Sequence, residues 1–177
     1  MILDFFKTAI NLKKIHRQGW IDKLSIQKPE SVADHSYSMA IMGMIISDLE
    51  NYNFEKIIKM ILLHDLAESK IGDYTPGQID LEKKNEIENT AFLKILEDLP
   101  NSLKSQYQNF WKEYQENTSP ESKIVHQIDK LEMALQAKTY QDEGYSEEQL
   151  ESFYESVKKE IVNPKLKELF RNIIEGK

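Results

Sequence analysis

The sequence predicts an all-α fold, a single bundle of about seven or eight helices. Apolar residues recur at helical spacing along most of the 177 residues, and typical helix-start residues precede several of these segments. No segment shows the apolar-polar alternation of a convincing strand. A chain of this length suits one domain with a substantial core. We therefore expect one domain over residues 1–177, with its core at about 17–140 and the C-terminal helices packed on it.

Composition and charge limit the classes of partner. The sequence has no cysteine, which excludes disulfides and thiolate metal sites and fits a cytoplasmic protein. It shows no signal-peptide pattern and no apolar run long enough to span a bilayer, so we expect no membrane partner. The net charge of −7 argues against a long nucleic acid. A small anionic substrate is compatible with this charge if a metal or local cations receive it.

The N-terminal region is expected to form a helix at residues 3–15 that Gly19 ends, followed by a polar connection at residues 21–30. Arg17, close to Trp20 on an irregular turn, could offer an anion-binding fork and a stacking plane. The simpler interpretation of the two residues in isolation is a surface arginine and a tryptophan that covers the core edge.

His35 lies near the start of a second expected helix, which runs to about residue 49. Ser31 is a plausible N-cap with Asp34 three residues later. His35 is the first residue of an inward-facing apolar stripe. The rest of that stripe is Met39, Met42 and Ile46. A lone histidine at such a position is usually a satisfied core residue.

The strongest chemical signal is the segment 60–76, with the sequence MILLHDLAESKIGDYTP. Its first half belongs to an expected helix over 54–69, which is apolar enough to be buried. That helix contains His64, Asp65 and Glu68, and burying these groups unpaired would be costly. A metal ion between the first two would compensate, and Glu68, one turn on, could hold a water beside the ion. The alternative is a structural histidine–aspartate hydrogen bond with a carboxylate at the helix end.

The residues that follow are expected to form a loop. Gly72 is a natural helix stop, and Asp73, Tyr74, Thr75 and Pro76 come after it. Polar groups just past a buried helix with an ion are well placed to touch a substrate. An ordinary turn aspartate is the alternative for Asp73.

The C-terminal half is expected to supply one more chemical group. Residues 79–98 suggest a solvated outer helix, with Lys84 and Glu88 facing outward. The aromatic-rich helix over 101–116 fits core or a subunit interface better than a base-stacking platform. In the helix that starts after residue 118, Asp129 lies at the edge of an apolar stripe, where an acid is commonly a salt-bridge partner.

Together, three expected helices each hold a metal-type ligand against an apolar face. These ligands are His35, His64, Asp65 and Asp129. Two imidazoles and two carboxylates favour a divalent ion such as Mn²⁺, Fe²⁺, Co²⁺, Ni²⁺ or Zn²⁺, and Mg²⁺ stays open. Four protein ligands leave positions for water in an octahedral site, which hydrolysis requires.

The order of these ligands resembles that of the HD-domain metal-dependent phosphohydrolases. The surrounding segments narrow the resemblance: residues 29–36 (PESVADHS), 63–68 (LHDLAE), 72–76 (GDYTP) and 127–133 (QIDKLEM). They are similar to the HD domain-containing protein 2 group, which is related to the YfbR-like bacterial 5'-deoxynucleotidases. The similarity runs from about Arg17 to the C-terminal helix.

The resemblance implies a role for each matching residue. The four candidate ligands match the metal ligands, and His35 also faces the substrate. Glu68 matches the acid needed for catalysis beside the metal, and Arg17 matches the arginine that orients the substrate phosphate. Trp20 matches a neighbouring tryptophan, although Gln18 and Gly19 separate it from Arg17, whereas the YfbR-like enzymes have the pair adjacent. The segment from Asp73 to Pro76 is implied to line the nucleotide site, with Asp73 also among the catalytic residues.

The implied activity is hydrolysis of deoxynucleoside 5'-monophosphates by a cytoplasmic homodimer with one divalent ion. Hydrolysis of a nucleoside triphosphate or guanosine tetraphosphate is an alternative, although such relatives carry more cationic phosphate ligands. A di-iron oxygenase would need further histidines between the HD pair and Asp129, where the chain has only His126. A non-catalytic helical binding module that keeps its metal for folding is disfavoured by Glu68 and Asp73, which holding the ion does not require.

Overall fold

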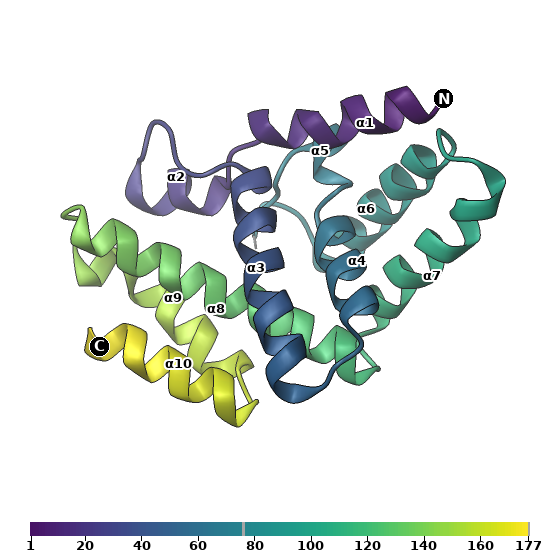
Figure 1. Cartoon of the computed structure of the whole chain (residues 1–177). Coiled ribbons are helices and arrows are strands. Elements are labelled where there is room, and N and C mark those ends of the chain that lie inside the picture. Colours follow the sequence, from purple (N-terminus) through teal and green to yellow (C-terminus); the bar gives the residue numbers. More distant parts are fainter. Residues whose placement is uncertain (76, 177) are drawn as a thin grey trace.

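The computed structural model describes residues 1–75 and 77–176, and these ranges are mainly helical, with an isolated bridge between His16 and Ser31 (Figure 1). This confirms the all-α prediction. In chain order the elements are α1 (Ile2–Asn11), the 3₁₀ helix η1 (Leu12–Lys14), α2 (Gln18–Leu24), α3 (Val32–Glu50), α4 (Phe54–His64), α5 (Glu68–Ile71), α6 (Leu81–Leu96), α7 (Asn101–Glu116), α8 (Pro120–Asp142), α9 (Glu147–Glu160) and α10 (Pro164–Glu175). No helix in the described ranges is long and apolar enough to cross a bilayer.

Helix α3 occupies the middle of the fold and packs against both α4 and α8. Gly43 permits the close approach of α3 and α4, because a Cβ at this position would collide with Ile61 and lie 3.0 Å from Cγ2 of Ile57. At its N-terminus, the expected capping box of Ser31 and Asp34 is present. The first turn of α3 is therefore fixed by local hydrogen bonds.

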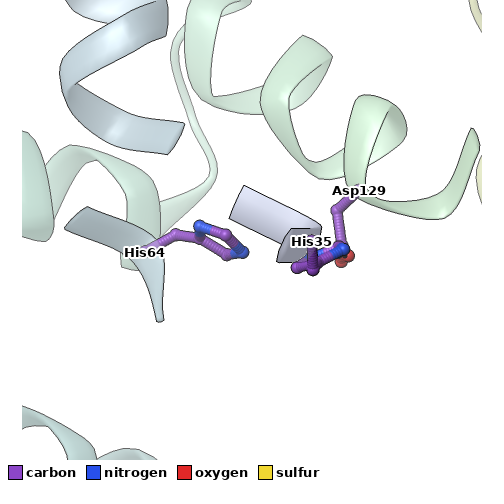
Figure 2. Close-up of side chains that lie close together, drawn as sticks. All are labelled: His35, His64 and Asp129. Atoms are coloured by element: carbon purple, nitrogen blue, oxygen red, sulfur yellow. Dashed lines mark ion pairs between the residues drawn. The ribbon is translucent and has the colours of Figure 1, made fainter. Parts of the chain in front are cut away.

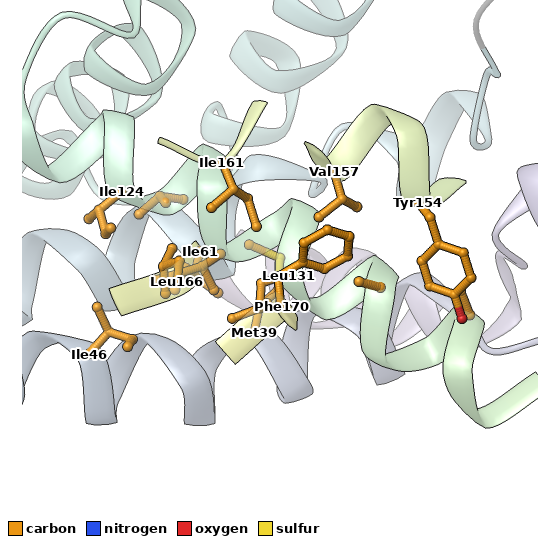
Figure 3. Packing of buried hydrophobic residues seen from close by; sticks show 14 of the residues in the cluster. Met39, Ile46, Ile61, Ile124, Leu131, Tyr154, Val157, Ile161, Leu166 and Phe170 are labelled. Carbon is orange, nitrogen blue, oxygen red and sulfur yellow. The ribbon is translucent and has the colours of Figure 1, made fainter. Parts of the chain in front are cut away.

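The buried apolar residues form two clusters. The larger unites α2, α3, α4, α8, α9 and α10, and Figure 3 shows part of it, including Met39, Ile61 and Leu131. The smaller unites η1, the start of α3, the end of α4, α6 and α7. On α3, His35 falls between Val32 of the smaller cluster and Met39 of the larger. The polar candidate residues thus lie where the two apolar clusters meet.

The structure corrects the expected role of Gly19. Residues 18–24 form α2, so Gly19 lies inside a helix. The chain instead leaves the helical conformation before α2, where the backbone N–H of Arg17 donates to the carbonyl of Glu30 and that of Val32 donates to the carbonyl of Ile15. These extended pairings hold Arg17 next to the start of α3.

The expected helix over 54–69 is also corrected, because it is two helices. Helix α4 ends at His64, Asp65 leaves the helical region with φ −106° and ψ 11°, and α5 begins at Glu68. Between them the backbone N–H groups of Leu66 and Glu68 each donate to the carbonyl three residues earlier, as in a 3₁₀ turn. The segment that carries His64, Asp65 and Glu68 therefore contains a break between two helices.

Candidate metal centre and active site

Two histidines are held with the same nitrogen facing the site. His35, on the first turn of α3, has its Nδ1 2.6 Å from Oε2 of Glu132 on α8. His64, the last residue of α4, has its Nδ1 2.6 Å from the backbone carbonyl of Ile61. The Nε2 atoms of both rings are buried without a hydrogen-bond partner. Each ring is thus oriented through Nδ1 and presents Nε2.

Two aspartates lie beside these nitrogens. Asp65 Oδ2 is 3.0 Å from Nε2 of His64 and 3.9 Å from Nε2 of His35. Asp129 Oδ1, from α8, is 3.2 Å from Nε2 of His35. Figure 2 shows His35, His64 and Asp129 gathered from three helices, and one ligand atom of each lies within 4.8 Å of the others. The structure therefore brings all four candidate ligands together.

The electrostatics of this cluster favour a cation. Burial disfavours the charged imidazole of His35, yet Asp129 and Glu132 outweigh burial and raise its pKa to about 9. Burial likewise opposes ionisation of Asp129, but His35, Lys130 and Arg17 hold the pKa of this carboxyl well below its usual range. Partnerless imidazole nitrogens beside ionised carboxylates match the nitrogen and oxygen donors that divalent transition metals prefer. The residues present fit the expected ion.

Glu68 is placed differently from what the sequence suggested. It opens α5 beyond the helix break, so it does not continue the His64 face of one helix. Its Oε2 is buried without a hydrogen-bond partner. Burial, then the charges of Asp65 and Asp73, raise the pKa of this carboxyl well above its usual value. A carboxyl with this environment is suited to accept and return a proton.

Arg17 lies over the two aspartates. Its Nη1 is 3.4 Å from Oδ2 of Asp65, and its Nη2 is 3.8 Å from Oδ1 of Asp129. Burial opposes the charge on the guanidinium, but the carboxylates of Asp65, Asp129, Asp73 and Glu68 raise its pKa further. The planar guanidinium is therefore charged and held beside Asp65 and Asp129.

The loop between α5 and α6 is hydrogen-bonded to residues of both α2 and α6. Asp73 Oδ2 accepts the backbone N–H of Gln18 at 2.7 Å, which places the carboxylate at the start of α2 beside Arg17. The hydroxyl of Thr75 donates to Asp22, and the carbonyl of Tyr74 accepts from Lys84 at 2.9 Å. Gly72 ends α5 with φ 82°, as a helix-stopping glycine should. The predicted role of Pro76 lies outside the described residues.

Trp20 is buried in the core and contacts Glu30 rather than a candidate metal ligand. Its side chain is 2% exposed, and its ring packs against Phe153 and Tyr140 with centroid distances of 4.1 and 5.1 Å. Its Nε1–H donates to Oε1 of Glu30 at 2.8 Å. This burial agrees with a core residue and leaves no open ring face for a nucleobase. The predicted substrate contact of Trp20 stays a prediction without structural support.

The sequence interpretation missed three residues near the site. Lys84 and Glu88 were expected to face outward, but Lys84 is hydrogen-bonded to the loop carbonyl and Glu88 is largely buried beside it. Both precede Ala91 and Ile95 on one helical face, a spacing that could have identified them. Glu132 follows Ile128 by four residues and so lies on the apolar stripe of α8. An ionisable residue within an apolar helical stripe is the sequence signal that could have identified all three.

The chain has recognisable relatives. A family model described as HD domain matches residues 9–169. The 5'-deoxynucleotidase HDDC2 of Homo sapiens is 36% identical over 169 residues, covering 95% of this chain and 82% of the relative. The protein of the same name from Dictyostelium discoideum is 36% identical over 178 residues, covering 94% of this chain and 93% of the relative.

Solved structures agree with the fold. The PH0347 protein of Pyrococcus horikoshii superposes with a TM-score of 0.82 at 31% identity, covering 99% of both chains. A conserved hypothetical protein of Pyrococcus furiosus has a TM-score of 0.75 at 29% identity, covering 98% of this chain and 99% of the other. The helical arrangement around the candidate metal centre is thus shared by solved proteins of similar length.

Proposed function

Since this chain belongs to the HD-domain family, we propose that it is a metal-dependent phosphohydrolase that converts deoxynucleoside 5'-monophosphates to deoxynucleosides and phosphate. Relatives that carry the name 5'-deoxynucleotidase match nearly the full length of this chain, which supports this activity. The single structural observation that carries the proposal is the set of partnerless buried atoms: Nε2 of His35, Nε2 of His64 and Oε2 of Glu68. Buried polar atoms are normally paired, so three unpaired ones in residues around one acidic cluster support a ligand and a reaction site there.

We assign the divalent ion to His35, His64, Asp65 and Asp129, with its identity open among Mn, Co, Fe, Ni, Zn and Mg. When bound, such an ion supplies Lewis acidity to the phosphate and to water. A cation there would also offset the two aspartates that now contact Arg17. The guanidinium would then be available to bind two phosphate oxygens and orient the phosphorus.

Glu68 is assigned the proton transfers. Its buried carboxyl, with a raised pKa, is suited to take the proton of the attacking water and return it to the 5'-oxygen as the phosphorus–oxygen bond breaks. The positive charge of Lys84, on α6, acts to lower the pKa of Glu68, and its ammonium group donates a hydrogen bond to the carbonyl of Tyr74. This leaves the loop, and Asp73 in it, fixed at the edge of the site.

The charges support one phosphate rather than three. Arg17 and Lys84 are the cationic side chains identified at the site, and the acids around them are more numerous. We propose that Asp73 meets the sugar, where a carboxylate can distinguish hydroxyl patterns by hydrogen bonds. Tyr74, Thr75 and Pro76 would line the nucleotide with little selectivity for the base. The expected preference is for 2'-deoxyribose.

The assembly and location belong to the same proposal. We propose one domain over the whole chain, a cytoplasmic location and a homodimer. The outer face of α3 supports the dimer, since it exposes large apolar side chains at helical spacing. These residues, called here the α3 stripe, are Tyr37, Ile41, Met44, Ile45 and Leu49. A second copy could cover this stripe by pairing α3 with α3 around a two-fold axis.

Three alternatives make different predictions. Hydrolysis of a triphosphate would require more cations than the site offers. A di-iron oxygenase is disfavoured because the Nε2 of His126 is bonded to the carbonyl of Tyr114 and its ring is stacked on that tyrosine. A non-catalytic module gives no reason for a Glu68 carboxyl whose Oε2 is buried without a hydrogen-bond partner.

The test is a phosphate-release assay with mono-, di- and triphosphates of ribo- and deoxyribonucleosides, each with several added divalent metals. We expect the fastest release from deoxynucleoside 5'-monophosphates and none after chelation. Faster release from triphosphates would support the first alternative. No release from any nucleotide by a metal-loaded protein would support the binding module.

A further inference from the structure

Behind His35 lie two acids, Glu132 and Glu30, to which the proposed reaction gives no role. The Nδ1 of His35 lies 2.6 Å from Glu132, which is one turn after Asp129 on α8. Both His35 and Glu132 are buried. Glu30 is a third group near these two residues. One potential ligand atom from each of Glu30, His35 and Glu132 lies within 4.8 Å of the other two.

The contact between His35 and Glu132 has a consequence for the opposite nitrogen. A neutral imidazole carries one proton, and the hydrogen bond at one nitrogen determines which nitrogen keeps it. A carboxylate at Nδ1 accepts the N–H of His35, so the lone pair belongs to Nε2. That atom is buried, makes no hydrogen bond and lies 3.2 Å from Oδ1 of Asp129.

We propose that Glu132 is a positioning residue for the metal centre, because its carboxylate fixes the tautomer and ring orientation in which His35 presents Nε2. This inference rests on the proposed metal site. Acceptors of this kind behind a metal-binding histidine also increase the basicity of the ligand. Glu132 itself touches neither the ion nor the substrate.

The second histidine provides an internal contrast. The Nδ1 of His64 is held by the backbone carbonyl of Ile61, which no side-chain substitution removes. Orientation of His35 instead depends on a side chain from another helix. The histidine on α3 is therefore the one whose metal-binding geometry a single substitution on α8 can disturb.

Glu30 and Trp20 complete the arrangement. The indole N–H of Trp20 donates to Glu30, so this carboxyl has a donor of its own. A second cation between Glu30, His35 and Glu132 is the competing explanation of the cluster. A second cation would require His35 to lose the Nδ1 proton that it donates to Glu132 in their hydrogen bond. The number of metal ions bound per chain therefore separates the two explanations.

The experiment measures Co²⁺ binding to the metal-free full chain by competition with a chromophoric chelator. The variants are Glu132→Ala, which removes the acceptor, and Glu132→Gln, whose amide oxygen can still accept the N–H. Gln127→Ala is the matched control, because Gln127 is a buried polar residue of α8 that accepts the backbone N–H groups of Val162 and Asn163, away from the site.

We expect wild type to bind one Co²⁺ per chain and Glu132→Ala to bind it roughly 10- to 100-fold more weakly. Glu132→Gln should lose less affinity, and at saturating Co²⁺ it should recover turnover with an unchanged KM. The control should bind Co²⁺ as wild type does, even if its melting temperature falls. If Glu132→Ala does not fold, Glu132→Gln alone carries the test through its partial loss of affinity.

Three results would overturn the positioning role. Equal Co²⁺ affinity in wild type and both Glu132 variants is the first, and an equal loss in Gln127→Ala is the second. Two Co²⁺ per wild-type chain, falling to one in the Glu132 variants, is the third and would assign a second cation site. Failure of wild type itself to bind Co²⁺ would refute the proposed metal site and the inference with it, a result distinct from the other three.

Discussion

The two sides of the candidate metal centre are built in different ways. On the side of α4 and α5, the residues His64, Asp65 and Glu68 come from five consecutive positions and are arranged by a local helix break. On the side of α3 and α8, His35 and Asp129 come from positions 94 residues apart and meet only because the two helices pack together. One side depends on local backbone geometry, and the other depends on tertiary packing.

This difference indicates where each side is vulnerable. The ring of His64 is oriented by a backbone carbonyl of its own helix. The ring of His35 is oriented by side chains of α8, and its charge is coupled to two of them. We therefore expect substitutions at α8 residues that are not ligands, such as Glu132, to change metal binding through geometry. Substitutions in the α4–α5 segment should act through loss of a ligand or a proton carrier.

The largest expected effect is loss of the ion when a ligand is removed from either side. His64→Ala and Asp129→Ala should each lose most of the bound metal in elemental analysis, because the remaining groups cannot complete the donor set. Chelation should lower the melting temperature of wild type but not of these variants. At a metal concentration of 100 times Kd the ion contributes about 2.7 kcal/mol, which corresponds to roughly 5–11 °C in melting temperature for a chain of this size. Full occupancy in both variants would refute the assigned ligands.

Glu68→Ala should give the next largest effect and should separate chemistry from binding. The residue is not an assigned ligand, so the variant should retain the metal and bind substrate. Loss of its proton transfer should lower kcat by about 10²- to 10⁴-fold with little change in KM. Turnover near the wild-type rate would show that Glu68 is only a buried carboxyl at a helix start.

The substrate contacts come third. Arg17→Ala should raise KM and lower kcat/KM for deoxynucleoside 5'-monophosphates by about 10- to 100-fold, since a charged bidentate contact is lost. Asp73→Ala should reduce activity or narrow the difference in rate between deoxyribo- and ribonucleotides. Lys23→Ala, an exposed lysine of α2, is a suitable control for charge alone. Unaltered kinetics in Arg17→Ala would remove the proposed phosphate contact.

The dimer prediction is tested on the α3 stripe. Ile45→Glu should shift the molecular mass measured by light scattering from dimer to monomer, because a charge would be buried in an apolar interface. Metal content should stay at the wild-type level, since Ile45 lies on the exposed face of α3. A monomeric wild type, or a variant that stays dimeric, would argue against this stripe as the interface.

The smallest expected effect concerns the local support of His35. Asp34 accepts the backbone N–H and the hydroxyl of Ser31, and these bonds lower the pKa of its carboxyl. A folded-state pKa below the unfolded value of about 3.9 stabilises the fold above that pH, and this contribution disappears as the pH falls through the folded-state value. Asp34→Asn should therefore cost at most about 1 kcal/mol near neutral pH, since the carboxylate is largely exposed. Urea unfolding at pH 7 and at low pH should show this difference shrinking; a pH-independent difference would contradict it.

The sequence alone determined the helical class, the starts of the longer helices and the identity of the chemical groups. A capping residue such as Ser31 acts on backbone groups within three positions, so local sequence is sufficient to identify it. The family motifs likewise predicted an HD-domain hydrolase, which the relatives support. These features require only short-range information.

Tertiary structure decided what each group faces. The helix break at Asp65, the inward turn of Lys84 and the acid behind His35 all depend on which helices pack together, and local periodicity does not contain that information. The burial of Trp20 against Phe153 is of the same kind, because the two residues come from α2 and α9. Side-chain chemistry is encoded residue by residue, whereas burial and electrostatic environment arise only when distant segments exclude water from one another.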